Sequence, residues 1–406
     1  MAVLEQNKEI VITVDPGFDA TKVVINGMLF KIPWNVVDVT ESKDTGIQIL
    51  AKTEDYILSH YIEGKSYLVG EQARKQLGMR SAKDMQNVKQ SLMDSFGKFT
   101  SEDFEINVMS SIGYALVRYS QKLEKDKKMG FNTADMSDYK LFVGIALPHD
   151  ALDIARNSVL KKIANHHSFK LELDDGDHEL DFTIEKGKCF FMSQAIMALM
   201  GAITDDNGDT NPDNMILQNL PTLVVDGGYK TMGIFVLTAA GRIDVTGDAS
   251  NTGFAMNVVH KRIAEVLQNE YGRTDIQDYN IPDIIESDGG RVVYEKDGNT
   301  DEVEIAPIFA KTVKELFNEM MEYINKNFER LLNIKSILVA GGTGSLYYPL
   351  MTEYVKTNKK HLDGKVIITD YKFLKGTITP EFAIAVGMYK VMKRLIQKAK
   401  EQNEQA

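Results

Sequence analysis

Two segments of this chain place an aspartate, glycines and a lysine at a turn between two runs of β-forming residues. In DPGFDATK, Asp15 ends one run and Lys22 opens the next, and VVDGGYKT repeats the arrangement around Asp226. Backbone amides and an ammonium at such a turn can hold a phosphate, and a carboxylate can orient a hydrated Mg²⁺. A single Asp-Gly turn is usually a plain hairpin turn. Two of them in matched surroundings indicate a site for a nucleoside triphosphate.

A third glycine-rich segment runs from Gly341 to Gly344, between a predicted buried strand and a predicted helix. The backbone amides at the start of a helix can receive a nucleotide. The segment is not a P-loop, because no Lys followed by Ser or Thr closes it, and it does not match the dinucleotide fingerprint. Alone, such a segment is more often a tight turn. The segment therefore indicates a nucleotide site only in combination with the two aspartate turns.

The elements that must position these residues alternate between β-rich segments and helices, which predicts an α/β fold. The expected elements are hairpins over 10–24, 169–185, 221–237 and 291–305, strands over 139–147, 334–340 and 366–370, a strand running into a helix over 189–203, helices over 104–123, 150–166, 306–332 and 380–400, and an irregular segment becoming a helix over 247–271. The echo between the two aspartate turns favours two related halves, and no short repeat indicates a solenoid.

The composition is that of an ordinary globular protein, with 406 residues, 43% hydrophobic and 26% charged. A net charge of -11 argues against direct wrapping of nucleic acid, which needs Lys and Arg surfaces. The single cysteine, Cys189, cannot form an internal disulfide, as expected in a reducing cytoplasm. No apolar run is long enough to span a membrane, and the first residues are too polar for a signal peptide. We therefore expect a soluble, cytoplasmic protein.

Other candidates for chemistry are weaker. His166 and His167 are adjacent, so they do not share a helix face as metal ligands would. The polar segment 204–214 departs from a calcium loop, with Thr210 where the glycine belongs and Ile216 where the bidentate glutamate belongs. It is expected to be a loop near a domain boundary. Cys189 is expected to be a buried core thiol.

Together, the motifs DPGFDATK, VVDGGYKT, AGGTGSLYYPL and FMSQAIMAL resemble the phosphate loops, adenosine motif and first connecting helix of the actin superfamily of ATPases. Within it, FKIPWNVV, YLVGEQARKQ, GIALPHDAL and TPEFAIAVGMYKVMK look like the bacterial ParM-type plasmid segregation proteins. The resemblance spans essentially the whole chain in the expected order. One departure lies in the second phosphate loop, where Tyr229 and Lys230 replace the usual small or hydroxyl residues.

The resemblance implies an actin-like fold of two related α/β domains around a nucleotide cleft. The first domain would comprise 1–188 and 376–406, with a smaller insertion within 30–105, and the second 189–375, with a smaller insertion around 260–330. The implied cofactors are Mg²⁺ and ATP, with GTP as the alternative nucleotide. The residues implied in catalysis are Gln194, Asp15 and Asp226, the two aspartates also serving the metal through water. The residues implied in nucleotide binding are Gly17, Asp19, Thr21, Lys22, Gly227, Gly228, Lys230, Thr231, Gly341, Gly342, Thr343, Gly344 and Ser345.

By the same resemblance, the chain hydrolyses ATP and polymerises head-to-tail into dynamic filaments that move plasmid DNA. The implied partner is a DNA-binding adaptor protein of the ParR type on plasmid centromere DNA, with no direct nucleic-acid or membrane binding. Two alternatives remain within the superfamily. A chaperone ATPase of the Hsp70 type would need a peptide-binding domain, and a sugar or acetate kinase would need a substrate pocket with a catalytic base, for which the sequence offers no candidate. A rod-shape filament of the MreB type would need an apolar membrane-binding element.

Overall fold

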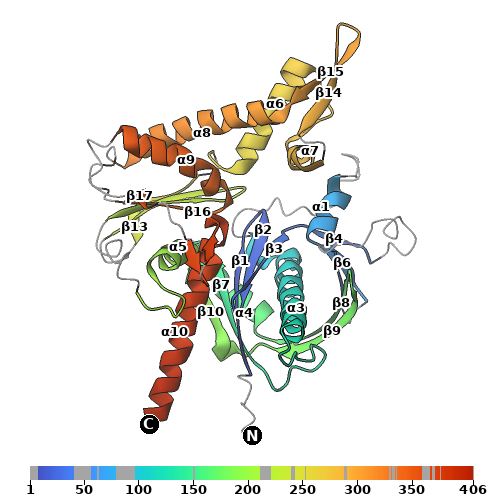
Figure 1. Ribbon diagram of the computed structural model, residues 1–406, viewed down its shortest axis with the longest axis vertical. Helices are drawn as coiled ribbons and strands as arrows, with labels where there is room; N and C mark the ends of the chain where they lie inside the picture. The colour runs from blue at the N-terminus through green and yellow to red at the C-terminus, as the bar shows by residue number, and fades with distance from the viewer. Residues whose placement is uncertain are drawn as a thin grey trace. The chain divides into compact units, whose positions relative to one another are not determined.

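The computed structural model in Figure 1 divides the chain into two compact units, each with its own sheet and hydrophobic core. Unit 1 comprises Met1–Asp209, Phe373–Gly376 and Ile384–Ala406, and unit 2 comprises Thr210–Lys372 and Thr377–Ala383. The structure describes residues 8–40, 56–61, 64–78, 97–149, 151–210, 221–238, 243–251, 253–287, 290–328, 331, 334, 336–358, 366–367, 371–374 and 376–405.

The central sheet of unit 1 has the order β10-β7-β1-β2-β3. Its strands are β1 (Glu9–Pro16), β2 (Ala20–Ile25), β3 (Met28–Pro33), β7 (Lys140–Leu147) and β10 (Cys189–Ser193). The first three form an antiparallel meander, and β7 and β10 continue from β1 in parallel. The run of consecutive apolar residues in β1 and β7 suits strands covered on both faces. The predicted hairpin over 10–24 and strand over 139–147 are confirmed.

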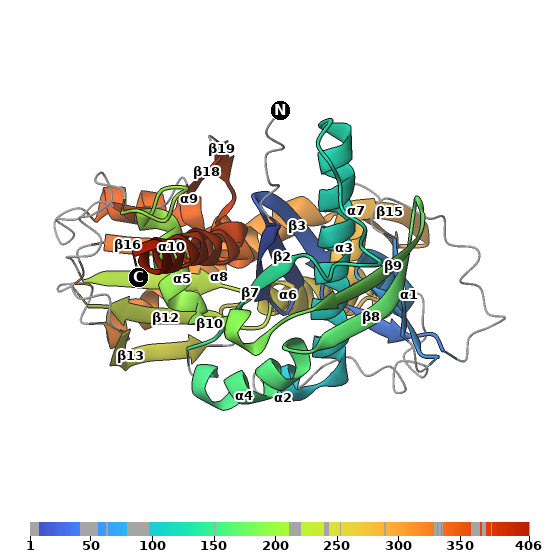
Figure 2. The ribbon, with the colours of Figure 1, turned by 90° about the horizontal axis from the view of Figure 1, so that it is seen from below.

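A second sheet of unit 1, in the order β4-β6-β5-β8-β9, lies against α3, as Figure 2 shows for β8 and β9. The elements are β4 (Val36–Asp38), β5 (Ile57–Tyr61), β6 (Ser66–Val69), β8 (His166–Leu173), β9 (Gly176–Thr183) and α3 (Glu102–Lys125). The apolar stripe of α3 faces this sheet, and Gly113 allows Leu180 and Phe169 close approach. The hydroxyl of Ser101 accepts a hydrogen bond from the Phe104 amide and caps the helix start. The predicted helix over 104–123 is confirmed.

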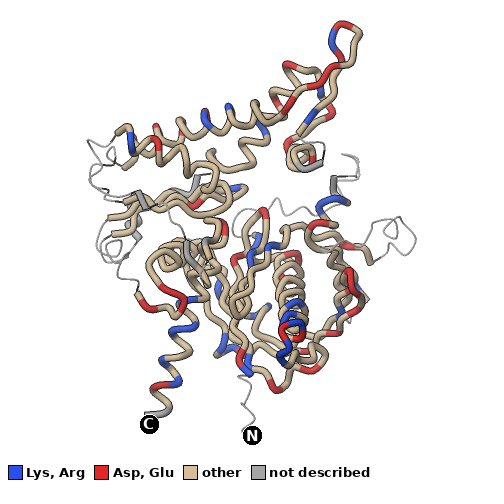
Figure 3. The backbone as a smooth tube through the Cα atoms, in the orientation of Figure 1, with Lys and Arg blue, Asp and Glu red and all other residues tan. Residues whose placement is uncertain are grey.

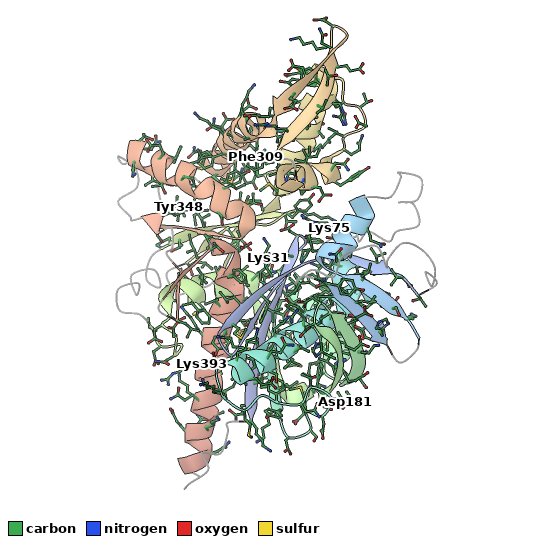
Figure 4. The ribbon with its side chains drawn as sticks, turned by 45° about the vertical axis from the view of Figure 1, so that its right-hand side comes forward. Lys31, Lys75, Asp181, Phe309, Tyr348 and Lys393 are labelled. Atoms are coloured by element: carbon green, nitrogen blue, oxygen red, sulfur yellow. The ribbon has the colours of Figure 1, made fainter. Side chains whose placement is uncertain are left out.

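The remaining helices of unit 1 are α1 (Glu71–Gly78), α2 (Gly97–Thr100), α4 (Leu152–Ile163), α5 (Gln194–Ile203) and α10 (Ala383–Gln405). Helices α5 and α10 touch backbone to backbone. A β-carbon at Gly387 of α10 would stand 1.9 Å from the carbonyl oxygen of Met197 in α5. The ammonium of Lys390 donates hydrogen bonds to the carbonyls of Gly201 and Thr204, at the end of α5. The last turns of α10 carry both signs of charge and continue to the chain terminus (Figure 3), and Figure 4 labels Lys393 on this helix.

The division between the units differs from the predicted domain boundary at 188/189. Strand β10 pairs in parallel with β7, and α5 follows it directly. Residues 189–209 therefore belong to unit 1 and not to the second domain. The polar segment 204–214, predicted to lie near a domain boundary, contains the division between the units at 209/210. Residues 211–214 of this segment lie outside the described part of the chain.

The sheet of unit 2 has the order β13-β12-β11-β16-β17. Its strands are β11 (Thr222–Gly227), β12 (Met232–Leu237), β13 (Ile243–Asn251), β16 (Ser336–Ala340) and β17 (Val366–Ile367). The predicted hairpin over 221–237 and the strand over 334–340 are confirmed. Strand β13 was not predicted, because IDVTGDASN is rich in residues that disfavour strands. Pairing with β12 holds it in the sheet despite that composition.

The helices of unit 2 are α6 (Met256–Tyr271), α7 (Ile281–Ser287), α8 (Ile305–Asn327) and α9 (Gly342–Thr357). Tyr347 of α9 is fully buried, and its hydroxyl donates to the carbonyl of Phe254 just before α6. Strands β14 (Arg291–Lys296) and β15 (Asn299–Glu304) form the predicted hairpin. Its turn residues Asp297 and Gly298 both have positive φ, as a two-residue hairpin turn requires. The chain continues through β18 (Tyr371–Phe373) and β19 (Gly376–Ile378).

The central sheet of unit 1 and the sheet of unit 2 have the same topology. Read from one edge, β3-β2-β1-β7-β10 in unit 1 corresponds to β13-β12-β11-β16-β17 in unit 2. In each, an antiparallel meander is extended by two parallel strands beside its first strand. The prediction of two related α/β halves is therefore confirmed. Among the helices of the described residues, none is both long and apolar enough to cross a membrane.

Candidate nucleotide-binding residues

The first aspartate turn joins β1 to β2 and brings Asp15 opposite Lys22 in the antiparallel register. Both side chains are buried, at 4% and 8% exposure. Gly17 lies between them in the turn, and a β-carbon there would stand 2.8 Å from the Ala20 carbonyl oxygen and 3.0 Å from the Lys22 ammonium. The backbone of the turn can close this tightly on the Ala20 carbonyl because position 17 is glycine.

Asp15 lies in a buried and electrostatically compensated environment. Burial raises the pKa of its carboxyl group, and the charge of Lys22, a hydrogen bond from Gln194 and the charge of Lys98 act in the opposite direction. Cations and donors around a buried carboxylate favour its ionised form. The arrangement suits a carboxylate that orients the water shell of Mg²⁺, which typically keeps several waters and needs few protein ligands.

Gln194 reaches Asp15 through the topology of the sheet. It is the first residue of α5, directly after β10, and β10, β7 and β1 run in parallel, so their carboxyl ends lie at one edge. The side-chain amide of Gln194 donates a hydrogen bond of 2.8 Å to Asp15, 179 residues away in the chain. The structure thus brings together Asp15, Lys22 and Gln194 in unit 1.

Two other predicted residues of this turn contact α3 and the segment at the end of β3. The Thr21 side chain is fully buried, and its hydroxyl lies 2.5 Å from the side-chain oxygen of Asn107 on α3. Asn107 in turn donates to the carbonyl of Pro33 at the end of β3. Asp19 is exposed, and its carbonyl accepts from the Trp34 amide. Thr21 and Asp19 therefore brace the turn through their contacts with α3 and the end of β3.

The second aspartate turn and the glycine-rich segment interlock in unit 2. Strands β11 and β16 are parallel neighbours, so Asp226 and Gly341 leave the sheet side by side. A β-carbon at Gly341 would stand 2.3 Å from the Gly227 carbonyl oxygen and 2.8 Å from an Asp226 carboxylate oxygen. At Gly227, it would stand 2.5 Å from the Gly344 amide nitrogen. The backbones can approach this closely only because both positions are glycine.

The turn after β11 is held at several points. The Gly228 amide donates to the Thr231 carbonyl, and the Thr343 hydroxyl donates to the Gly228 carbonyl at 2.7 Å. The Tyr229 carbonyl accepts from the Asn257 amide at the start of α6, and the Tyr229 ring lies 5.6 Å from the imidazole of His260. Tyr229, which departs from the family pattern, thus packs on α6.

Lys230, the other departure in this turn, is half-buried, and burial lowers the pKa of its ammonium. Gly341 follows β16 with a φ of +79°, and α9 begins at Gly342. In the described residues no side chain caps the start of α9, and Thr343 is buried while Ser345 Oγ lies 3.3 Å from the Gly341 carbonyl. The first amides of α9 thus present the positive end of the helix dipole, as an anion site requires.

Sequence reasoning missed two residues of unit 1 that support the first turn, Asn107 and Lys98. Both lie far along the chain from DPGFDATK, and neither belongs to a recognisable motif. Lys98 donates to two carbonyls of the turn. Among the described residues, no group of three or more His, Cys, Asp or Glu side chains comes together as a metal cluster. Burial raises the pKa of the Cys189 thiol to about 11, which leaves it protonated and unreactive near neutral pH.

The two related sheets, the two aspartate turns and the glycine-rich start of α9 together define an actin-like fold, and this is the fold of solved actin-like proteins. The actin-like protein Alp7A is 16% identical and superposes with a TM-score of 0.66 over 98% of this chain and 99% of its own. A ParM filament protein from Clostridium botulinum is 16% identical, with a TM-score of 0.64 over 95% and 99%. The archaeal actin homolog Ta0583 in complex with ADP is 14% identical, with a TM-score of 0.60 over 95% and 99%.

The chain matches no protein-family model and no curated protein sequence. At 14–16% identity, the likeness to the solved structures establishes the fold. The resemblance drawn from the motifs is therefore confirmed at the level of the actin-like architecture.

Proposed function

We propose that this chain is a cytoplasmic ATPase that polymerises head-to-tail into nucleotide-dependent filaments and thereby segregates plasmid DNA. The observation that carries the proposal is the cluster at the first turn, in which half-buried Gln194 donates a hydrogen bond to buried Asp15, opposite buried Lys22. Its support is the likeness in fold to a ParM filament protein and to an actin homolog that binds ADP.

Nucleotide binding is assigned to both aspartate turns. In the first, Lys22 and the backbone around Gly17 would neutralise and bind phosphate oxygens. In the second, the backbone around Gly227 and Gly228, with Lys230 and Thr231, would do the same. The segment from Gly341 to Ser345 would pack against the adenosine. Asp15 and Asp226 would hold Mg²⁺ through its water shell, and bound Mg²⁺ would neutralise charge on the phosphate oxygens.

The role proposed for Gln194 follows from its hydrogen bond. Because its amide nitrogen donates to Asp15, its amide oxygen is left to accept a hydrogen bond from another donor. A water held by that oxygen would be oriented for attack on the terminal phosphate. Catalysis would then come from positioning and electrostatics, without a covalent intermediate.

Filament assembly requires a contact between two different surfaces of the same chain, which repeats without closing. ATP binding would favour this contact and hydrolysis would release it. The net charge of -11 suits a filament that reaches DNA through a basic adaptor of the ParR type and not by direct contact.

The test is a Gln194→Ala variant, compared with wild type in ATP binding, phosphate release and light scattering with ATP and Mg²⁺. Loss of the water-orienting amide should slow phosphate release by about a hundredfold, the usual range for one positioning group. ATP binding should stay within about threefold of wild type, because Gln194 does not contribute uniform binding energy. Filaments should form and persist longer.

Gln397→Ala is the matched control, because this glutamine lies exposed on α10 and its side-chain amide donates to Glu401 in the same helix. It should behave as wild type in all three assays. Unchanged phosphate release in Gln194→Ala would remove the residue from the mechanism. A wild-type chain that stays monomeric with ATP and hydrolyses it only when a sugar is added would overturn the proposal.

A further inference from the structure

Lys98 is an almost completely buried lysine in unit 1. It belongs to the short helix α2, ahead of α3, and is 1% exposed. A buried ammonium is costly unless its charge and its donors are matched by the surroundings. The partners of this side chain therefore indicate what it does.

Those partners come from the first aspartate turn. The Lys98 ammonium donates to the Pro16 carbonyl at 2.6 Å and to the Gly17 carbonyl at 2.7 Å. It also lies 4.3 Å from the ring centre of Phe18 and 3.7 Å from that of Trp34. Three successive residues of the turn thus surround one cation, and the two aromatic faces add cation–π attraction.

The hydrogen bonds from the Lys98 ammonium determine the orientation of the turn's peptide groups. In a trans peptide, the carbonyl of one residue points away from the amide N–H of the next. Holding the Gly17 carbonyl on Lys98 therefore directs the Phe18 N–H away from the ammonium. The Gly17 N–H is held separately by the Asp15 carbonyl at 3.0 Å. Lys98 thus selects which face of the turn presents amides and which presents carbonyls.

Lys98 and Lys22 act on the same turn in different ways. The Lys22 ammonium lies beside the α-carbon of Gly17, whereas Lys98 binds the carbonyl of that residue. An ammonium has three donors, and Lys98 commits two of them to the turn. Its charge still acts on Asp15, where it favours the ionised form. Lys98 therefore supports the turn without being assigned to the phosphate itself.

We propose that Lys98 is a positioning residue that holds the first aspartate turn in its phosphate-binding shape before nucleotide arrives. This inference rests on the proposed binding of ATP by that turn. It predicts that removing the ammonium weakens the binding of ATP and ADP together, because the turn meets phosphates common to both. The rate at saturating ATP should change little, since this is uniform binding energy.

The test uses Lys98→Met, which keeps an unbranched side chain of nearly the same volume without the ammonium, with Lys390→Met as matched control. Lys390 is also a lysine of unit 1 with 1% exposure and two carbonyl partners, but these are Gly201 and Thr204 at the end of α5. Fluorescent ATP and ADP titrations, phosphate release and thermal unfolding are measured on the full chain. Both variants should lose stability. Only Lys98→Met should bind ATP and ADP at least about tenfold more weakly than wild type. Its rate of phosphate release at saturating ATP should stay within about threefold of wild type.

The outcomes separate the two proposals. A wild-type chain that binds neither ATP nor ADP rejects the proposed function. If the wild-type chain binds ATP and ADP and both variants bind them with wild-type affinity, only the role of Lys98 is overturned. The same conclusion follows if Lys98→Met and Lys390→Met lose affinity equally.

If Lys98→Met does not fold, a second pair of variants decides. Phe18→Leu removes one aromatic face from the ammonium at a half-buried position, and Phe131→Leu makes the same change at a half-buried position beside Tyr119. Phe18→Leu should weaken ATP and ADP binding several-fold relative to Phe131→Leu. Equal affinities would overturn the positioning role.

Discussion

Gly341 shows how the second half of the candidate site depends on single residues. Its φ is +79°, a region that side chains with a β-carbon rarely adopt, and the space where a side chain would start is filled by the Gly227 carbonyl and the Asp226 carboxylate. Gly227 faces the same restriction from Gly344. Gly227 and Gly341 are therefore required by the mutual contact of the two motifs, before any ligand is considered.

A Gly341→Ala variant should have a free energy of unfolding about 2 kcal/mol or more below that of wild type, since the backbone conformation at this position, with φ of 79° and ψ of 167°, costs a residue with a β-carbon on the order of 1–3 kcal/mol and the backbone clash adds to it. The measurement is urea unfolding followed by circular dichroism.

The neighbouring residue provides the control for this prediction. At Gly342 no described atom lies within 4 Å of the position of a β-carbon, and the residue opens α9. Gly342→Ala should therefore stay within about 1 kcal/mol of wild type. Equal losses in the two variants would show that the strain at Gly341 is not what matters.

At the scale of elements, the corner between α4 and β8 contains a half-buried titratable group. His167 is the second residue of β8, and its ring forms a hydrogen bond of 2.9 Å with the Ile163 carbonyl at the end of α4 and packs on Phe182. Burial lowers the pKa of His167 from its usual 6.5, with further lowering by His166, against the raising effects of the Ile163 hydrogen bond and Glu105. The folded chain therefore resists protonation of this ring.

This environment predicts a loss of stability in mild acid. Because the folded pKa of His167 lies below the unfolded one, the unfolded chain binds more protons, so the free energy of unfolding falls as the pH drops through about 6.5 and below. His167→Gln can keep a donor to the Ile163 carbonyl but cannot titrate. The difference in unfolding free energy between about pH 7.5 and about pH 5.5 should be smaller in this variant than in wild type. An identical pH profile would exclude His167 as the source.

At the scale of the whole molecule, the same strand order recurs in both units, each with an aspartate as the next-to-last residue of its first strand. The chain also carries a net charge of -11, and both signs of charge are distributed along its elements (Figure 3). Subunits of like net charge repel one another as they assemble.

For the proposed filament, this charge predicts that salt favours assembly. Added salt shortens the Debye length to about 10 Å at 0.1 M and below at higher concentration, which screens the repulsion between subunits. The critical concentration for assembly with ATP and Mg²⁺ is measured by sedimentation. It should decrease as the KCl concentration is raised from about 50 mM to about 300 mM. A rise would indicate that opposite charges paired across the contact outweigh the net charge.

The sequence by itself determined the features that are local in the chain. Both aspartate hairpins, the long helices α3 and α8 and the hairpin at Asp297 and Gly298 follow from hydrophobic periodicity and turn chemistry, which act over a few residues. The candidate residues Asp15, Lys22 and Gln194 were found through motifs of the same short range. The α/β class follows from the order of these elements.

Tertiary structure alone decided what depends on contacts between distant segments. Strand β13 forms because it pairs with the edge of β12. Residues 189–209 belong to unit 1 because β10 pairs with β7. Lys98 meets the first turn from 81 and 82 residues away, and Gln194 meets Asp15 from 179. Contacts between residues so far apart in the chain produce no periodic pattern in the sequence, because they form only when the folded sheet and its helices bring the distant segments together.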